Sequence, residues 1–81
     1  MNTITITAQD VLQTLLVCAG EPERPIPAGA LEDVTFEQLG YDSLALIEAA
    51  TRLEDQFGVR IPDEDLPSFK TFGQLVERAN G

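Results

Sequence analysis

The sequence predicts an all-α fold: a small bundle of three main helices plus a short helix, with a long first loop. Three segments repeat apolar residues at the helical period, and a proline-containing connection separates the first two. Strand character is limited to Ile4-Thr5-Ile6, a short alternating run without a partner strand. With 81 residues, of which 43% are hydrophobic, the chain is expected to form one domain spanning residues 1–81.

The first helix is expected from Ala8 to Ala19. Thr7 has the residue type and position of an N-cap, and Asp10 places a negative charge in the first turn. Gly20 offers a left-handed stop. The apolar face comprises Ala8, Val11, Leu12, Leu15 and Ala19, with Leu16 and Cys18 beside it.

A long loop, Gly20 to Asp42, follows the first helix. Such loops are unusual in small domains unless they are functional or partly structured. Thr35 and Gln38 have capping-box spacing, which favours a short helical turn. The residues expected to hold the loop against the helices are Val34, Phe36 and Leu39.

The second helix is expected from Ser43 to Phe57, where Gly58 ends it. Its narrow apolar face comprises Leu46, Ala49, Ala50, Leu53 and Phe57. Residues 59–62 should be extended, because the residue before Pro62 avoids the helical region. A short acidic turn is expected at Asp63-Glu64-Asp65-Leu66, before Pro67.

The third main helix is expected from Phe72 to Asn80. Thr71 and Gln74 form a second capping-box pair at its start. Its inward residues are expected to be Phe72, Leu75, Val76 and Ala79.

Composition restricts the possible functions. The chain has no histidine, which excludes Ser–His and Cys–His catalysis within it, and its single cysteine cannot form an internal disulfide. The Cys/His clusters of a zinc site are missing, and no metal site is expected. A net charge of −9 disfavours binding to nucleic acids and anionic membranes, and it either favours basic protein partners or simply maintains solubility.

The expected location is the cytoplasm, as a monomer. The N-terminus lacks the basic start and apolar centre of a signal peptide. No apolar run approaches the ~18 residues of a membrane span.

The start of the second helix allows two interpretations. Asp42 or Ser43 must lie at or beside the N-cap, and both could be caps and nothing more. Alternatively, Ser43 exposes its hydroxyl to a modifying enzyme, and a phosphodiester formed there would face the positive end of the helix dipole.

A family resemblance favours the second interpretation. The stretch Leu39-Gly40-Tyr41-Asp42-Ser43-Leu44-Ala45-Leu46-Ile47-Glu48 resembles the attachment motif of acyl carrier proteins, whose core is Asp-Ser-Leu. The similarity continues through Arg52-Leu53-Glu54, Phe57-Gly58-Val59 and Ile61-Pro62. The Gly-Tyr-Asp-Ser-Leu-Ala-Leu form and the following Pro62-Asp63 look most like carriers of bacterial type II (aromatic) polyketide synthases.

The resemblance implies an acyl-carrier-like bundle and a non-catalytic carrier. Ser43 would hold a covalent 4′-phosphopantetheine arm taken from coenzyme A, and its thiol would carry malonyl and growing polyketide thioesters. The implied partners are a phosphopantetheinyl transferase, a ketosynthase with its chain-length factor, a malonyl transferase, a ketoreductase and cyclases. Fatty-acid and peptidyl carriers remain alternatives, as does an acidic adaptor without a prosthetic group. An enzyme using Asp63 and Asp65 is a remote alternative, because an acidic solvated turn explains them better.

Partner docking is expected near the attachment point. The resemblance gives Asp42 a role in placing the carrier and a magnesium ion in the transferase complex. The remaining docking candidates are Leu44, Ile47, Glu48, Glu54 and Asp55, which combine acids with two apolar side chains on or beside the outward face of the second helix. The alternative is that one of Leu44 and Ile47 belongs to the core and the other is an ordinary exposed residue.

Three small residues remain. Ala49 and Ala50 either leave room for an acyl chain between helices or permit close packing, and close packing is the preferred interpretation. Cys18 is interpreted as a small buried hydrophobic residue rather than the thiol that carries the thioester.

Overall fold

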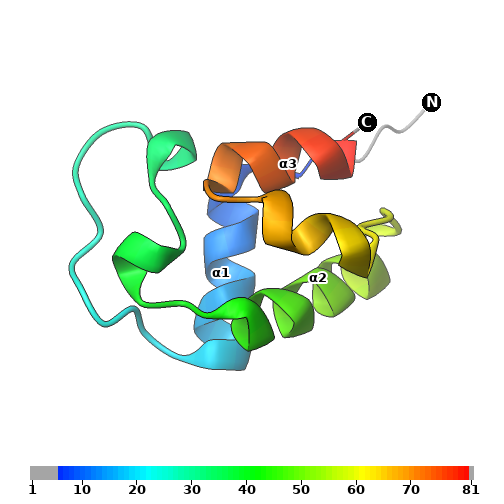
Figure 1. Ribbon diagram of the computed structural model, residues 1–81, viewed down its shortest axis with the longest axis horizontal. Helices are drawn as coiled ribbons and strands as arrows, with labels where there is room; N and C mark the ends of the chain where they lie inside the picture. Colours follow the sequence, from blue (N-terminus) through cyan, green and yellow to red (C-terminus); the bar gives the residue numbers. More distant parts are fainter. Residues whose placement is uncertain (1–5, 81) are drawn as a thin grey trace.

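The computed structural model describes residues 6–80, which form three α-helices and three short 3-10 helices (Figure 1). In chain order these are α1 (Ala8–Ala19), η1 (Leu31–Asp33), η2 (Glu37–Leu39), α2 (Ser43–Phe57), η3 (Asp63–Ser68) and α3 (Phe72–Asn80). The bounds of all three α-helices match the sequence-based expectation, and the predicted all-α class is confirmed.

The caps explain where two of the helices begin. At α1, the Thr7 hydroxyl accepts a hydrogen bond from the Asp10 N–H at 3.2 Å, and the Asp10 carboxylate accepts one from the Thr7 N–H at 2.9 Å. At α3, the Thr71 hydroxyl accepts from the Gln74 N–H at 3.2 Å. The Gln74 side chain returns the bond to the Thr71 N–H at 3.3 Å. Each pair satisfies backbone donors that the first turn of a helix leaves without partners.

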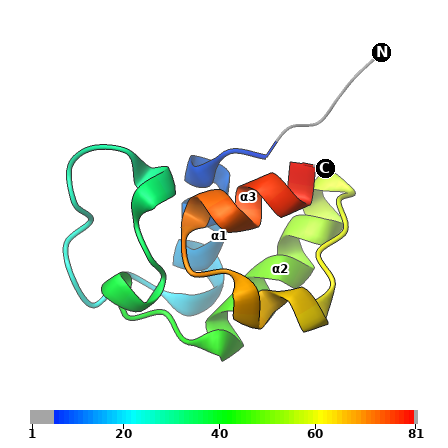
Figure 2. The ribbon, with the colours of Figure 1, turned by 45° about the horizontal axis from the view of Figure 1, so that its top comes forward.

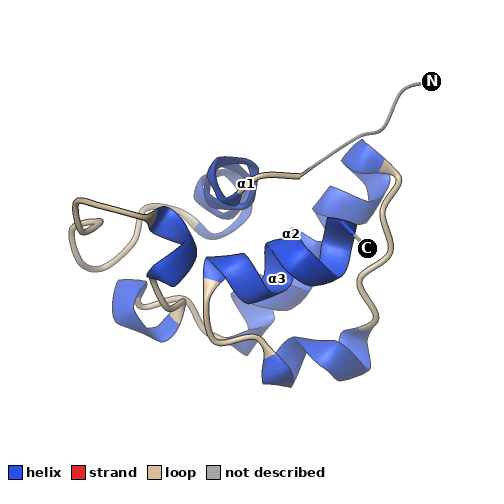
Figure 3. Ribbon diagram, turned by 90° about the horizontal axis from the view of Figure 1, so that it is seen from above, coloured by secondary structure: helices blue, strands red, loops and turns tan. Residues whose placement is uncertain are grey.

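The three α-helices surround one core. In Figure 3, α1 is seen end-on while α3 lies over α2, so α1 crosses both of them. The long loop with η1 and η2 forms one end of the molecule, and η3 links α2 to α3. Figure 2 shows that the start of α2 and the end of η3 lie next to each other, far from the two ends of the described segment. Ile6 and Asn80 hold those ends together with two reciprocal hydrogen bonds of 2.8 Å.

The core contains the predicted loop anchors. Val34, Phe36 and Leu39 are all buried, and the Phe36 and Phe72 rings lie 4.5 Å apart between centroids. Its other members are Ile6, Ala8, Val11, Leu12, Leu15, Tyr41, Ala45, Leu46, Ala49, Ala50, Leu53, Ile61, Leu66, Leu75 and Ala79. The C-terminal half of the long loop is therefore packed into the core.

Some inward positions were predicted wrongly. Ala19, the last residue of α1, is exposed. Thr14 is buried instead, and its hydroxyl donates a 2.9 Å hydrogen bond to the Asp10 carbonyl, which removes the cost of burying it. Phe57, Val76 and Cys18 are half-buried at the margin of the core rather than inside it.

The connecting segments also differ from expectation. Gly20 ends α1 with the positive φ of 86° that glycine allows, but its ψ of −174° lies outside the left-handed helical region. The acidic turn continues as η3 through Pro67 to Ser68, because 3-10 bonds from Asp65 to Pro62 and from Phe69 to Leu66 hold both its ends. Helix η1 was not anticipated. Residues 4 and 5 of the Ile4-Thr5-Ile6 run lie outside the described residues.

One pair of segments joins the long loop to α3. An isolated antiparallel bridge pairs Thr35 with Thr71. Beside it, the Phe36 N–H donates to the Lys70 carbonyl at 3.0 Å, and the Phe72 N–H donates to the Val34 carbonyl at 3.1 Å. These bonds fix the residues just before α3 against the loop that leads into α2.

Candidate attachment site at the start of the second helix

Asp42, and not Ser43, caps α2. Asp42 has the extended backbone of an N-cap, with φ −96° and ψ −178°, and its Oδ1 accepts a hydrogen bond from the Ala45 N–H at 2.9 Å. Ser43 is the first residue of the helix itself. The ambiguity left by the sequence is thereby resolved, and capping does not occupy the serine hydroxyl.

The Ser43 side chain is exposed at the N-terminal end of a 15-residue helix. Among the described residues, no hydrogen bond engages its hydroxyl, which is accessible to a second molecule. The positive end of the α2 dipole and the free N–H groups of its first turn favour an anion at this place. A phosphodiester on the Ser43 oxygen therefore fits the residues present.

The loop before Ser43 is held by contacts that the sequence did not reveal. Gly40 is in the left-handed region, with φ 86° and ψ 14°, and a Cβ there would lie 2.8 Å from the Glu23 side chain. The Glu23 N–H donates to the Leu39 carbonyl at 2.8 Å. The Tyr41 hydroxyl donates to the Gly20 carbonyl at 2.9 Å, and burial raises the pKa of Tyr41 above its ordinary value. These contacts connect the end of α1 and the start of the long loop to residues 39–41, just before the start of α2.

A groove of about 700 Å³ opens beside Ser43, between the start of α2 and η3. It is lined by Thr35, Glu37, Gly40, Tyr41, Asp42, Ser43, Leu46, Ile47, Asp63, Leu66, Pro67, Phe69 and Lys70. Ala49 and Ala50 are fully buried in the core and do not line this groove, which agrees with the preferred interpretation that they permit close packing. No sequence pattern predicted the groove, because its two sides come from separate segments.

The candidate docking residues do not share one setting. Leu44 and Ile47 are 63% and 41% exposed, so neither belongs to the core. Glu48 and Asp55 are also exposed. Glu54 is half-buried, and its Oε2 accepts a 2.7 Å hydrogen bond from the Ile61 N–H, which pins the segment after α2.

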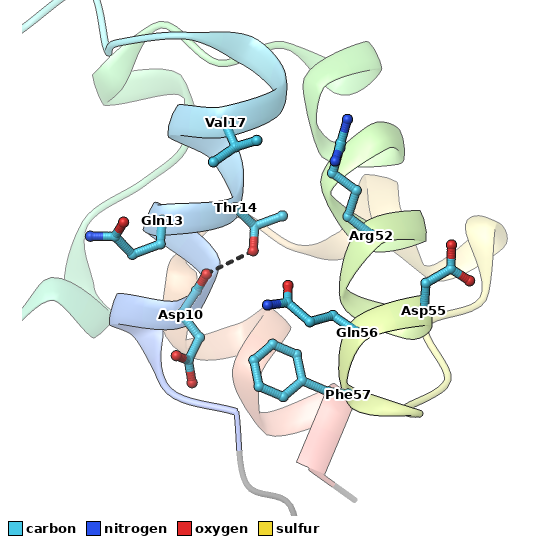
Figure 4. Close-up of a pocket in the computed structure, with 8 residues that line it drawn as sticks. All are labelled: Asp10, Gln13, Thr14, Val17, Arg52, Asp55, Gln56 and Phe57. Atoms are coloured by element: carbon cyan, nitrogen blue, oxygen red, sulfur yellow. Dashed lines mark hydrogen bonds between the residues drawn. The ribbon is translucent and has the colours of Figure 1, made fainter.

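Asp55 faces a different region from Ser43. It lines a groove of about 530 Å³ between α1 and α2, together with Asp10, Gln13, Thr14, Val17, Arg52, Gln56 and Phe57 (Figure 4). Neither Ser43 nor any other candidate docking residue lines that groove. Of the docking candidates, Asp42, Leu44, Ile47 and Glu48 lie within about one and a half helical turns of Ser43, and the last three are on α2 itself.

The Cys18 thiol lies in surroundings that make it less reactive. Cys18 is half-buried, and burial followed by the Glu48 carboxylate raises the pKa of its thiol. A raised thiol pKa lowers the nucleophilicity of the thiol at neutral pH.

Within residues 6–80, no three acidic or sulfur side chains cluster in a way that could hold a metal ion. No helix in that range is long and apolar enough to cross a membrane.

Comparison with known proteins shows the family to which the chain belongs. A family model described as "Phosphopantetheine attachment site" matches residues 18–79. The acyl carrier protein of the actinorhodin polyketide synthase from Streptomyces coelicolor is 42% identical over 76 residues, which cover 94% of this chain and 88% of that protein. The acyl carrier protein of the granaticin polyketide synthase from Streptomyces violaceoruber is 47% identical, covering 89% of this chain and 86% of that protein.

Solved structures agree with the sequence relatives. The holo form of the actinorhodin acyl carrier protein superposes with a TM-score of 0.80, at 39% identity, over 99% of this chain and 93% of that chain. A malonyl form of the same carrier superposes with a TM-score of 0.78 over the same shares. The similar proteins are carrier subunits rather than catalysts, and their prosthetic group is phosphopantetheine. The chain belongs to the family of acyl carrier proteins that bear a phosphopantetheine attachment site.

Proposed function

We propose that Ser43 is the residue that receives the phosphopantetheine arm. The observation that supports this is that Asp42 caps α2, which leaves the Ser43 hydroxyl exposed and without a capping role. The Ser43 oxygen would bond to the phosphorus of coenzyme A that carries the pantetheine. The bond from that phosphorus to 3′,5′-adenosine bisphosphate would break, and the serine proton would pass to a base of the transferase.

Intact mass tests the assignment. The protein is incubated with coenzyme A, magnesium and a broad-specificity phosphopantetheinyl transferase, and we expect the mass to increase by one arm. Ser43→Ala should abolish the increase, whereas Ser68→Ala, at the other serine of the chain, should retain it. An increase that survives Ser43→Ala, or no increase in the wild type, contradicts the assignment.

The cargo is proposed from the relatives and the groove. Two relatives serve the actinorhodin and granaticin synthases, and the solved neighbour is known in a malonyl form. In this chain the groove beside Ser43 has apolar walls at Leu46, Leu66 and Phe69, where a thioester chain could lie. We therefore propose that the arm carries malonyl and growing polyketide units rather than fatty-acid or aminoacyl units.

The proposed partners are the enzymes that load and use such an arm. They are a phosphopantetheinyl transferase, a ketosynthase with its chain-length factor, a malonyl transferase, a ketoreductase and cyclases. Residues 1–81 would act as one carrier domain, monomeric in the cytoplasm. The docking set Leu44, Ile47 and Glu48 combines two exposed apolar side chains with an acid close to Ser43, which suits brief contact with a basic partner.

Charge reversal tests this docking role. We expect Glu48→Lys to slow malonyl transfer and ketosynthase acylation at low salt, because it removes attraction near the arm. The matched control is Glu77→Lys, which makes the same change in net charge on the exposed side of α3. Equal rates for the two variants would show that only net charge matters and that Glu48 has no local docking role.

A further inference from the structure

Lys70 lies at the rim of the Ser43 groove on a fixed backbone. Its N–H donates to the Gln74 Oε1 at 2.6 Å, and its carbonyl accepts from the Phe36 N–H at 3.0 Å. Both bonds involve main-chain atoms, so they hold the position of the residue without engaging its ammonium group. The side chain is exposed and lines the groove.

The charge of Lys70 differs from everything around it. The other charged residues that line the groove are three acids, Glu37, Asp42 and Asp63, and Lys70 is its one cation. Elsewhere in the described part of the chain, Arg78 pairs with Asp65 at 3.0 Å and Arg24 donates to the Gln38 carbonyl. Among the described residues, no carboxylate lies within 4.0 Å of the Lys70 ammonium.

This arrangement leads to a proposal that depends on Ser43 being the attachment site. We propose that the Lys70 ammonium binds an anionic oxygen group of the arm carried by Ser43. Two such groups exist on a loaded arm: the phosphodiester next to Ser43 and the terminal carboxylate of a malonyl unit. Both accept charge-assisted hydrogen bonds from an ammonium group, whereas a neutral acyl end does not.

The acids strengthen the argument for a defined position. An anion in the groove is repelled by the three carboxylates, and Lys70 is the one charged side chain of the lining that attracts it, so beyond the start of α2 Lys70 determines where it rests. Since the ammonium is exposed, the pair forms in a partly solvated setting and is sensitive to salt. Lys70 is thus a specificity-determining residue that favours anionic over neutral states of the arm.

The chain offers a clean probe, because Lys70 is its only lysine. Lysine labelled with ¹³C and ¹⁵N gives one set of side-chain signals, which are recorded in the apo, holo, malonyl and butyryl forms. Butyryl is the matched neutral control for malonyl. The ³¹P signal of the phosphodiester and the signal of a ¹³C-labelled malonyl carboxylate are compared in wild type, Lys70→Gln, Lys70→Arg and Arg60→Gln. Arg60 is an exposed cation outside the groove.

The two sources of the anion give different results. If the phosphodiester is bound, the Lys70 signals shift between apo and holo, and Lys70→Gln moves the ³¹P signal. If the malonyl carboxylate is bound, the Lys70 signals shift on loading with malonyl but not with butyryl, and Lys70→Gln moves the carboxylate signal. In either case the ³¹P or carboxylate signal of the arm should stay close to its wild-type position in Lys70→Arg and should be unchanged in Arg60→Gln. Added salt should reverse the shift of the Lys70 signals.

Lys70 signals that coincide in all four forms would overturn the proposal, as would equal shifts for malonyl and butyryl without a change between apo and holo. Measuring the loading by mass distinguishes failure of the Lys70 proposal from failure of the Ser43 assignment. A protein that loads normally but shows no Lys70 response still has its attachment site. A protein that does not load at all contradicts the assignment of Ser43.

Discussion

Tyr41 connects the segment just before Ser43 to the end of α1 through one side-chain hydrogen bond. Its hydroxyl donates to the Gly20 carbonyl, while its ring is buried in the core two residues before Ser43. We expect Tyr41→Phe to lower the free energy of unfolding by about 0.5–1.5 kcal/mol, because the ring stays buried and only the hydrogen bond is lost. Urea unfolding measures this, and a variant as stable as the wild type would show that water replaces the bond without cost.

The same residue gives the protein a pH dependence. Burial raises the pKa of Tyr41 above the ordinary value of 10.0, so the unfolded state ionises first. Its contribution to stability is complete below pH ~10 and is lost as pH rises through the folded-state pKa. Tyr41 is the only tyrosine and there is no tryptophan, so tyrosinate absorbance follows this group alone. We expect the absorbance midpoint to be higher in folded protein than in urea, and equal midpoints would contradict the effect of burial.

At the scale of the element, α2 has a different task at each end. Its first turn presents Ser43, while near its last turn Glu54 accepts the 2.7 Å hydrogen bond from the Ile61 N–H. Ile61 is buried and begins the approach to η3, which forms the far side of the groove. We infer that Glu54 acts mainly by positioning this segment.

We expect Glu54→Ala to cost about 1–3 kcal/mol, because it leaves a buried N–H without its acceptor. Glu54→Gln keeps an acceptor oxygen and should cost less. Asp55→Ala is the matched control, an exposed neighbouring acid whose loss should change stability by less than about 0.5 kcal/mol. Denaturant unfolding of the three variants measures this order, and equal losses for Glu54→Ala and Asp55→Ala would refute the positioning role.

The same scale shows what local sequence can predict. The helix bounds follow from nearby residues, such as Thr7 with Asp10 and Thr71 with Gln74, so periodicity and caps were sufficient. The course of η3 through Pro67 was missed: 3-10 bonds hold both its ends, and it also packs against α2, a contact that no local pattern encodes. Ser43 was proposed as the attachment residue from its motif. The groove and Lys70 were not, because they depend on residues 35–47 meeting residues 63–70 in space.

At the scale of the whole molecule, charge has opposite effects on folding and on binding. The chain carries 14 acidic and 5 basic residues, and the described part contains one salt bridge, between exposed Arg78 and Asp65. Attraction between its own groups is therefore scarce, and repulsion among carboxylates is spread over the surface. The same excess of negative charge attracts basic partners over long range.

Salt should separate these two effects. Raising the ionic strength from 0.01 M to 0.1 M shortens the Debye length from about 30 Å to about 10 Å, which weakens both the self-repulsion and the attraction to partners. We expect the melting temperature to rise, with each gain of about 1 kcal/mol adding about 4–8 °C, while the rate of transfer to a ketosynthase falls. Differential scanning calorimetry and transfer assays across one salt series measure both, with Glu48→Lys and Glu77→Lys as variants of reduced charge. Because each variant removes part of the repulsion, its melting temperature should depend less on salt than that of the wild type. A melting temperature that falls with salt would mean that specific ion pairs, and not net repulsion, dominate the stability of the folded carrier.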